Sequence, residues 1–93
     1  MKKHENQINL FLCKNNLLER IAFYALPNEL HYHDSLYGTP ATTLKVEDGK
    51  YQISSRRDAE RGIVFSKTFQ NEKKAINYFM EMLKADTYNV QQH

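Results

Sequence analysis

The alternation of apolar and polar residues over residues 44–53 predicts a β-hairpin. Asp48 and Gly49 form a strong two-residue turn signal, because a type I′ turn needs positive φ at both central positions. With this turn, Val46 lies opposite Tyr51, and directly opposed residues point to the same face of a sheet. A one-residue slip would destroy this agreement between turn and pattern. The predicted apolar face holds Leu44, Val46, Tyr51 and Ile53.

Apolar spacing predicts a helix near each end of the chain. Residues 6–14 have apolar side chains at i, i+3 and i+4, with Asn6 as the N-cap and Asn15-Asn16 as the stop. Residues 72–84 have a longer apolar stripe that begins after Asn71, a second predicted N-cap. The stripe consists of Ala75, Ile76, Phe79, Met82 and Leu83.

The remaining patterns predict strands that run antiparallel. The expected strands are residues 21–26, a short piece within 29–40, 42–47, 50–55 and 63–69. The fold class is therefore α+β: an antiparallel sheet of 3–5 strands, with the N-terminal and C-terminal helices packed on one face. The chain forms a single domain over residues 1–93. We expect the polar ends, residues 1–5 and 86–93, to be flexible.

Composition narrows the class of protein. Cys13 is the single cysteine, which excludes an intramolecular disulfide and fits the cytoplasm; its apolar neighbours suggest a core position. The longest apolar run, Ile21 to Leu26, is too short for a membrane span. The net charge is +2, but residues 26–48 carry −3 and residues 49–74 carry +4. Such a bipolar surface suits a protein partner at least as well as a polyanion.

No pattern of residues indicates catalysis or a cofactor. His31 and His33 share one face of a strand, but a zinc site needs three or four ligands and a second cluster is missing. The serines lack a Gly-x-Ser-x-Gly elbow, and the three glycines form no phosphate loop. We therefore expect no enzymatic activity, no metal and no cofactor.

Two segments are candidates for binding a partner. Residues 56–62 form the densest charged segment, which is either a solvated hairpin loop or a recognition loop rich in arginine. The acidic segment 29–40 contains tyrosines suited to anchor an interface. The predicted contact residues are Glu29, Tyr32, His33, Asp34, Tyr37, Arg56, Arg57, Asp58, Glu60 and Arg61.

Over about residues 8–83, the chain resembles small bacterial immunity proteins. These accompany polymorphic toxins, including those of contact-dependent growth inhibition. The resemblance rests on Glu60-Arg61-Gly62, a strand that ends at Phe69, and Asn71-Glu72 before a helix with Ala75 and Phe79. Tyr51 stands where the family pattern has a tryptophan. The resemblance implies a cytoplasmic protein that binds a cognate toxin domain without catalysis, either at its active site or beside it; it leaves a homodimer open.

The alternative is a nucleic-acid-binding module. The order α-β-β-β-α, with Lys73-Lys74 at the start of the last helix, is similar to a double-stranded RNA-binding domain. Bulky side chains replace the small ones of that family's helix, and the net charge is low for a polyanion binder. Nucleic acid is therefore the less favoured partner.

Overall fold

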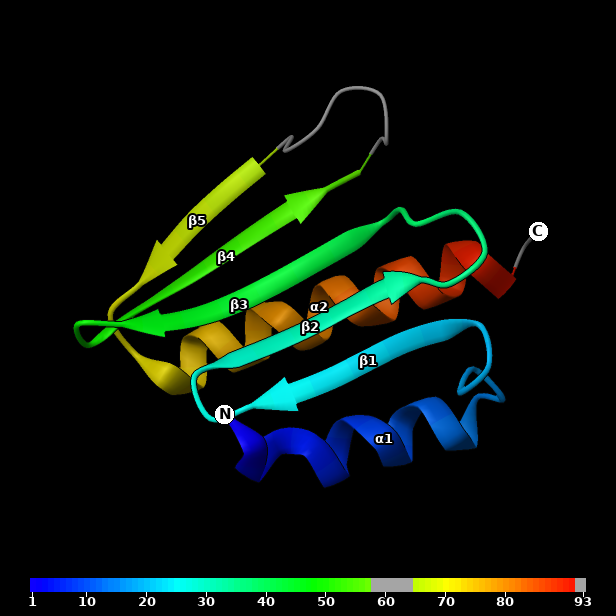
Figure 1. Ribbon diagram of the computed structural model, residues 1–93, viewed down its shortest axis with the longest axis horizontal. Coiled ribbons are helices and arrows are strands. Elements are labelled where there is room, and N and C mark those ends of the chain that lie inside the picture. The colour runs from blue at the N-terminus through cyan, green and yellow to red at the C-terminus, as the bar shows by residue number, and fades with distance from the viewer. Residues whose placement is uncertain (58–64, 92–93) are drawn as a thin grey trace.

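The computed structural model describes residues 1–57 and 65–91. It confirms the α+β class: along the chain, five strands follow an N-terminal helix and precede a C-terminal helix (Figure 1). In chain order the elements are η1 (Lys2–His4, a 3-10 helix), α1 (Glu5–Lys14), β1 (Ile21–Leu26), β2 (Glu29–Asp34), β3 (Ala41–Glu47), β4 (Lys50–Arg56), β5 (Phe65–Phe69) and α2 (Glu72–Gln91).

The five strands form one antiparallel sheet in sequence order, so each strand pairs with its neighbours along the chain. The predicted hairpin register is confirmed: Val46 lies opposite Tyr51 and Glu47 opposite Lys50. Asp48 and Gly49 form the turn with φ of 51° and 74°. Local turn chemistry and the binary pattern therefore set the centre of the sheet.

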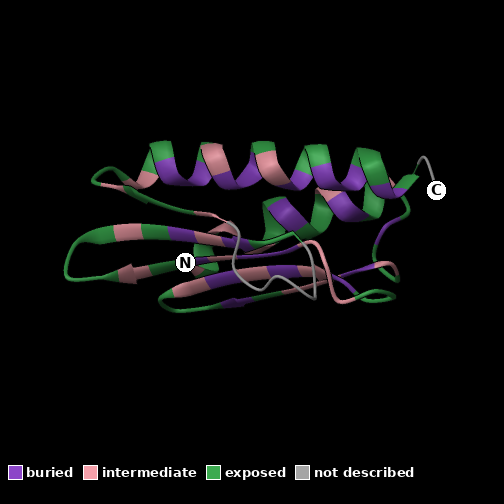
Figure 2. Ribbon diagram, turned by 90° about the horizontal axis from the view of Figure 1, so that it is seen from above, coloured by how far each residue is buried: buried purple, intermediate pink, exposed green. Residues whose placement is uncertain are grey.

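Both helices cover the same face of the sheet and leave the other face open (Figure 2). This follows from the period-2 alternation of the strands, which sends apolar side chains toward the helices and polar ones away. The helix-facing core includes Ile8, Leu12, Ile21, Ala25, Leu30, Tyr32, Leu44, Ile53, Ala75, Phe79 and Leu83. The sequence prediction that the helices share one face is confirmed.

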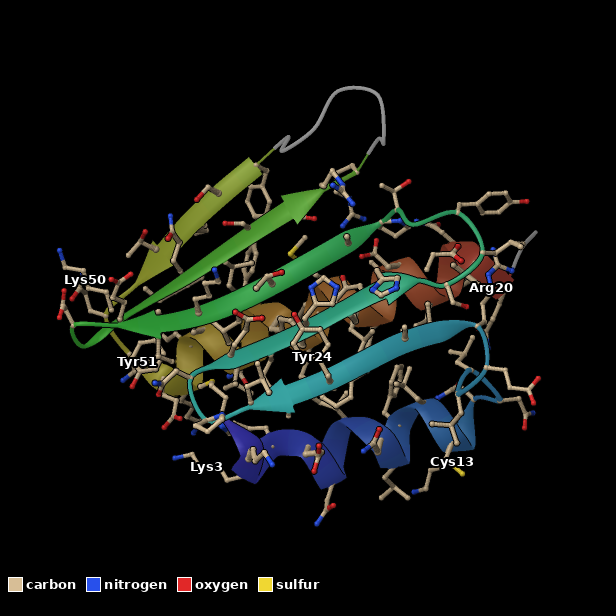
Figure 3. The ribbon with its side chains drawn as sticks, viewed as in Figure 1. Lys3, Cys13, Arg20, Tyr24, Lys50 and Tyr51 are labelled. Atoms are coloured by element: carbon tan, nitrogen blue, oxygen red, sulfur yellow. The ribbon has the colours of Figure 1, made fainter. Side chains whose placement is uncertain are left out.

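Helix α1 begins at Glu5, one residue before the predicted start, and has no side-chain N-cap. Its end is as predicted: Asn16 takes a left-handed φ of 57°, and Asn15 Nδ2 donates to the Phe11 carbonyl at 2.8 Å. The prediction of a buried Cys13 is wrong. Its side chain is exposed and points away from the sheet (Figure 3), about 100° around the helix from Leu12, which is buried.

The two ends of the chain are more ordered than we predicted. Residues 86–91 continue α2 instead of forming a loose tail, and Asp86 and Val90 are buried. At the N-terminus, residues 2–4 form η1, and the Met1 ammonium donates to the Pro27 carbonyl. Polar composition misled the prediction, because a polar end can still carry anchoring contacts. Neither helix within the described ranges is long and apolar enough to cross a membrane.

The hairpin turn provides a test of the backbone strain that a side chain at position 49 would cause. Gly49 has positive φ, and a Cβ added there would meet no atom within 4 Å. Gly49→Ala should therefore destabilise the fold through the backbone alone, by about 1–2 kcal/mol. Urea denaturation measures this loss.

Lys50→Ala, one position along, is the control and should change stability by less than about 0.5 kcal/mol. If the two variants lost equal stability, the strain argument for the turn would fail.

Candidate functional site

The candidate site is a cleft of about 400 Å³ at one end of the sheet. The β2–β3 loop, the end of β4 and the last turns of α2 come together there. Figure 3 shows Arg20 at this end of the molecule, opposite the hairpin tip with Lys50. We call this site the Arg–Asp cleft; it is lined by Arg20, Asp34, Tyr37, Thr39, Pro40, Arg57, Asp86, Asn89 and Val90.

The first Arg–Asp pair fixes the start of the β2–β3 loop. Arg20 Nε and Nη2 donate to the two carboxylate oxygens of Asp34, each at 2.9 Å. The same carboxylate accepts the backbone N–H of Leu36 at 2.8 Å. Because these donors stabilise the charged form, they hold the pKa of Asp34 below its usual value.

Backbone and hydroxyl contacts complete the loop. The Gly38 N–H donates to the Asp34 carbonyl at 2.7 Å, and the Ser35 N–H donates to the Arg20 carbonyl at 2.9 Å. The Ser35 hydroxyl also reaches the Arg20 carbonyl, at 2.8 Å. The chain turns over residues 35–37, and Gly38, at φ 78°, closes this turn. The loop is therefore anchored by hydrogen bonds to Asp34, at its start, and to Arg20, just before β1.

This rigid loop exposes two large side chains. Leu36 is 65% exposed and Tyr37 is 68% exposed. The Arg20 guanidinium carbon lies 5.5 Å from the centre of the Tyr37 ring, within the range of a cation–π contact. Leu36 and Tyr37 thus project from an anchored scaffold.

The second Arg–Asp pair joins α2 to the sheet. Arg57 Nη1 donates to Asp86 at 2.9 Å and to the Ser55 hydroxyl at 2.8 Å, and Nη2 donates to the other Asp86 oxygen. The Tyr32 hydroxyl donates to the same carboxylate from β2. Both Asp86 and Tyr32 are buried, so a charged group is satisfied inside the protein by two elements at once.

Electrostatics in this cluster follow from burial and charge. Burial alone would lower the pKa of Arg57, but its hydrogen bonds to Asp86 and the carboxylate charge outweigh burial and raise it. Burial, together with the charge of Asp86, raises the pKa of the Tyr32 hydroxyl far above its usual value. The hydroxyl therefore stays protonated and keeps donating to Asp86.

In each pair the carboxylate lies behind its guanidinium. The Asp34 and Asp86 side chains are 2% exposed, whereas Arg20 and Arg57 are 27% and 34% exposed. A molecule that enters the cleft meets hydrogen-bond donors before acceptors. The cleft is thus suited to bind a surface that carries acceptors and an apolar recess.

The open face of the sheet carries a separate polar cluster. The His31 ring stacks on Tyr24, with ring centres 4.9 Å apart, and bonds both Thr43 and His33. The Tyr24 hydroxyl donates to Glu29 at 2.7 Å. These five residues, Tyr24, Glu29, His31, His33 and Thr43, are called the histidine network below. Within the described residues, no group of three or more metal-ligating side chains is present.

The structure places seven of the ten predicted contact residues: three in the Arg–Asp cleft, three on the open face of the sheet, and Tyr32 in the core. Asp34, Tyr37 and Arg57 meet in the Arg–Asp cleft. Glu29, His33 and Arg56 lie on the open face, with Ala41 between His33 and Arg56 in the register. Asp58, Glu60 and Arg61 lie outside the described residues.

The prediction of a contact role is wrong for Tyr32, and Asp34 has a different role from the one predicted. Tyr32 is 0% exposed and packs edge-on against Phe79, with ring centres 5.4 Å apart, so it cannot anchor a partner. The reason is that side chains alternate between the two faces along β2, so Leu30, Tyr32 and Asp34 all point toward the helices. Asp34 lines the cleft, but its carboxylate is buried and holds the loop.

Sequence reasoning missed Arg20, Leu36, Asp86 and Asn89. A signal existed for Asp86, because the apolar stripe of α2 continues through positions 83, 86 and 90. A carboxylate in such a stripe needs a buried partner. No comparable pattern marks Arg20, which precedes β1 and whose partner, Asp34, lies on β2.

Comparisons with protein-family models, with curated proteins and with solved structures found no match.

The Arg57–Asp86 pair provides a stability test with a direction. Arg57→Met should destabilise by about 3–5 kcal/mol, because it leaves a buried carboxylate without its cation. Asp86→Leu should cost less, because the partly exposed Arg57 can turn to water. The double variant should be more stable than the sum of the two losses predicts. Urea denaturation of all four proteins closes the cycle, and additive losses would contradict the pairing.

The lowered pKa of Asp34 predicts how the stability of the folded protein changes at acidic pH. Its pKa is lowered in the folded protein, so its contribution is complete above the unfolded value of about 3.9 and is lost as pH falls through the folded value. Asp34→Asn should therefore melt below the wild type at pH 7, and the two melting temperatures should converge as pH falls below about 4. A difference that stays constant from neutral to strongly acidic pH would refute this assignment.

Proposed function

We propose that the protein binds and neutralises a cognate protein toxin in the cytoplasm, without catalysis. The resemblance to small bacterial immunity proteins suggests this class. The observation that supports a contact site is the anchored β2–β3 loop, which exposes Leu36 and Tyr37 beside the Arg–Asp cleft. The proposed interface is therefore the loop, residues 35–40, together with the cleft.

Rigidity makes this loop a suitable binding element. Binding costs conformational entropy for each side chain and loop that becomes ordered in the complex. A loop that is already fixed by hydrogen bonds reduces that cost. Large aromatic and apolar side chains near the centre of an interface dominate binding energy. Tyr37 and Leu36 meet both conditions.

The cleft adds specificity to this apolar contact. Arg20 and Arg57 present guanidinium edges, while the carboxylates that neutralise them are buried. A toxin surface with carbonyl or carboxylate oxygens near an apolar recess would complement it. The proposed interface uses hydrogen bonds around an apolar centre and does not mimic nucleic acid.

The nucleic-acid alternative predicts a different surface. Lys73 and Lys74 are exposed at the start of α2, and Val90 of the cleft lies about 24 Å along the same helix. The sheet has five strands, two more than the order on which the RNA-binding resemblance rests. Variants at the two ends of α2 can therefore separate the two functions.

The main test measures binding to the toxin domain encoded immediately upstream. Leu36→Ala and Tyr37→Ala should each weaken binding by about 2 kcal/mol, or about 30-fold in Kd, because each removes an exposed anchor from a fixed loop. Isothermal titration with a catalytically inactive toxin measures Kd, and co-expression with active toxin measures protection of growth.

Leu10→Ala is the matched control. Leu10 is 54% exposed on α1, away from the cleft, and its loss should leave Kd unchanged. Binding that survives both loop variants would move the interface elsewhere. Absence of toxin binding, together with salt-sensitive duplex RNA binding that Lys73→Glu abolishes, would replace the proposed function by the alternative.

A further inference from the structure

The histidine network places two imidazole nitrogens side by side on the open face of the sheet. His31 Nε2 and His33 Nδ1 are 2.9 Å apart. Both residues lie on β2 at alternate positions, so their side chains leave the strand in the same direction. Tyr24, which stacks on His31, lies in the middle of the open face in Figure 3. Both described helices lie on the other face of the sheet (Figure 2).

The neighbours of His31 orient its ring. Thr43 Oγ1 lies 2.8 Å from Nδ1 and can accept the proton of that nitrogen, which leaves Nε2 with a free lone pair. The Tyr24 ring, tilted by 19° from the imidazole, restricts the rotation of His31. In protein metal sites the second ring N–H of a ligand histidine is held by an outer partner, usually a carboxylate, a backbone carbonyl or water, and the Thr43 hydroxyl would take that place here.

Without an ion, one proton joins the two rings. His33 Nδ1–H donates to His31 Nε2 when Thr43 takes the other His31 proton. An ion could take the place of the shared proton if His33 moved its own proton to Nε2. Both imidazoles would then be neutral, and both facing nitrogens would carry lone pairs. The two rings need to turn slightly so that the lone pairs converge on the ion.

The spacing fits one class of ion. Bonds of about 2.05 Å that meet at about 90° place two ligand nitrogens about 2.9 Å apart. A right angle belongs to square-planar and tetragonal sites, which Cu²⁺ and Ni²⁺ prefer with nitrogen ligands, whereas tetrahedral zinc needs a wider separation. Among divalent first-row ions, Cu²⁺ binds such ligands most tightly.

We propose that His31 and His33 form a two-imidazole site for Cu²⁺, in which water fills the remaining coordination positions. The same site would bind Ni²⁺ more weakly. The surrounding charges include one anion, Glu29, and two cations, Lys45 and Arg56. The site lies on the opposite face from the core and does not depend on the proposed toxin interface.

The test titrates the full chain with Cu²⁺ at pH 7.4. Electron paramagnetic resonance should show one ion with two imidazole nitrogens, and NMR amide signals near His31, His33 and Thr43 should broaden first. His31→Asn and His33→Asn should each weaken binding at least about tenfold. Thr43→Val removes the group that fixes the tautomer and should weaken binding by about the same factor while both ligands remain.

His4→Asn is the control, because it removes an imidazole near the chain terminus and should leave the affinity unchanged. Circular dichroism confirms that each variant is folded. The proposal is overturned if the His31→Asn/His33→Asn double variant binds Cu²⁺ like the wild type, or if His4→Asn abolishes the signal. It is also overturned if Zn²⁺ binds more tightly than Cu²⁺.

Discussion

The buried carboxylate of Asp86 is the constraint on which the loop end of this molecule depends. It accepts hydrogen bonds from Arg57 at the end of β4 and from Tyr32 in β2, so one side chain joins α2 to two strands. Burying a carboxylate is unfavourable unless such partners are in place, which restricts α2 to one position over the sheet. The last turns of the helix are held there, and Asn89 and Val90 become one wall of the Arg–Asp cleft.

The two ends of the sheet therefore differ in character. At the hairpin end, β3 and β4 are joined by a tight turn whose geometry needs only Asp48 and Gly49. At the other end, two buried carboxylates, Asp34 on β2 and Asp86 on α2, accept hydrogen bonds from donors on loops and strands. The two Arg–Asp pairs at that end anchor the loop that exposes Leu36 and Tyr37. The side chains suited to contact a partner therefore lie at this end of the sheet.

The hairpin was predictable because all the information is local. Turn residues and alternating polarity lie within residues 44–53, and both indicate the same register. The α+β class and the strands predicted at 21–26 and 63–69 followed from similarly local patterns; the structure describes the second strand from residue 65 to residue 69. Helix ends were less predictable. The last turns of α2 look polar, and their order depends on Arg57, 29 residues away in the chain.

The candidate site was predictable only in part. Tyr37 was predicted to be a contact residue because it lies in the acidic segment 29–40, and the structure exposes its side chain. Tyr32 was misassigned because its segment was judged by composition, although the alternation with His31 and His33 indicated an inward side chain. The cleft itself unites residues from four segments, and a pairing such as Arg20 with Asp34 leaves no mark in either segment alone.

The sequential order of the strands has a consequence for how the protein forms. Each strand pairs with the next one along the chain, so the sheet can grow hairpin by hairpin through contacts of short sequence separation, which favours rapid folding. The contacts of Asp86 are different: they span 29 residues to Arg57 and 54 residues to Tyr32. Closing such long loops costs more entropy, so we expect the last turns of α2 to dock after the sheet forms. On this argument, the α2 wall of the cleft assembles later than the hairpins.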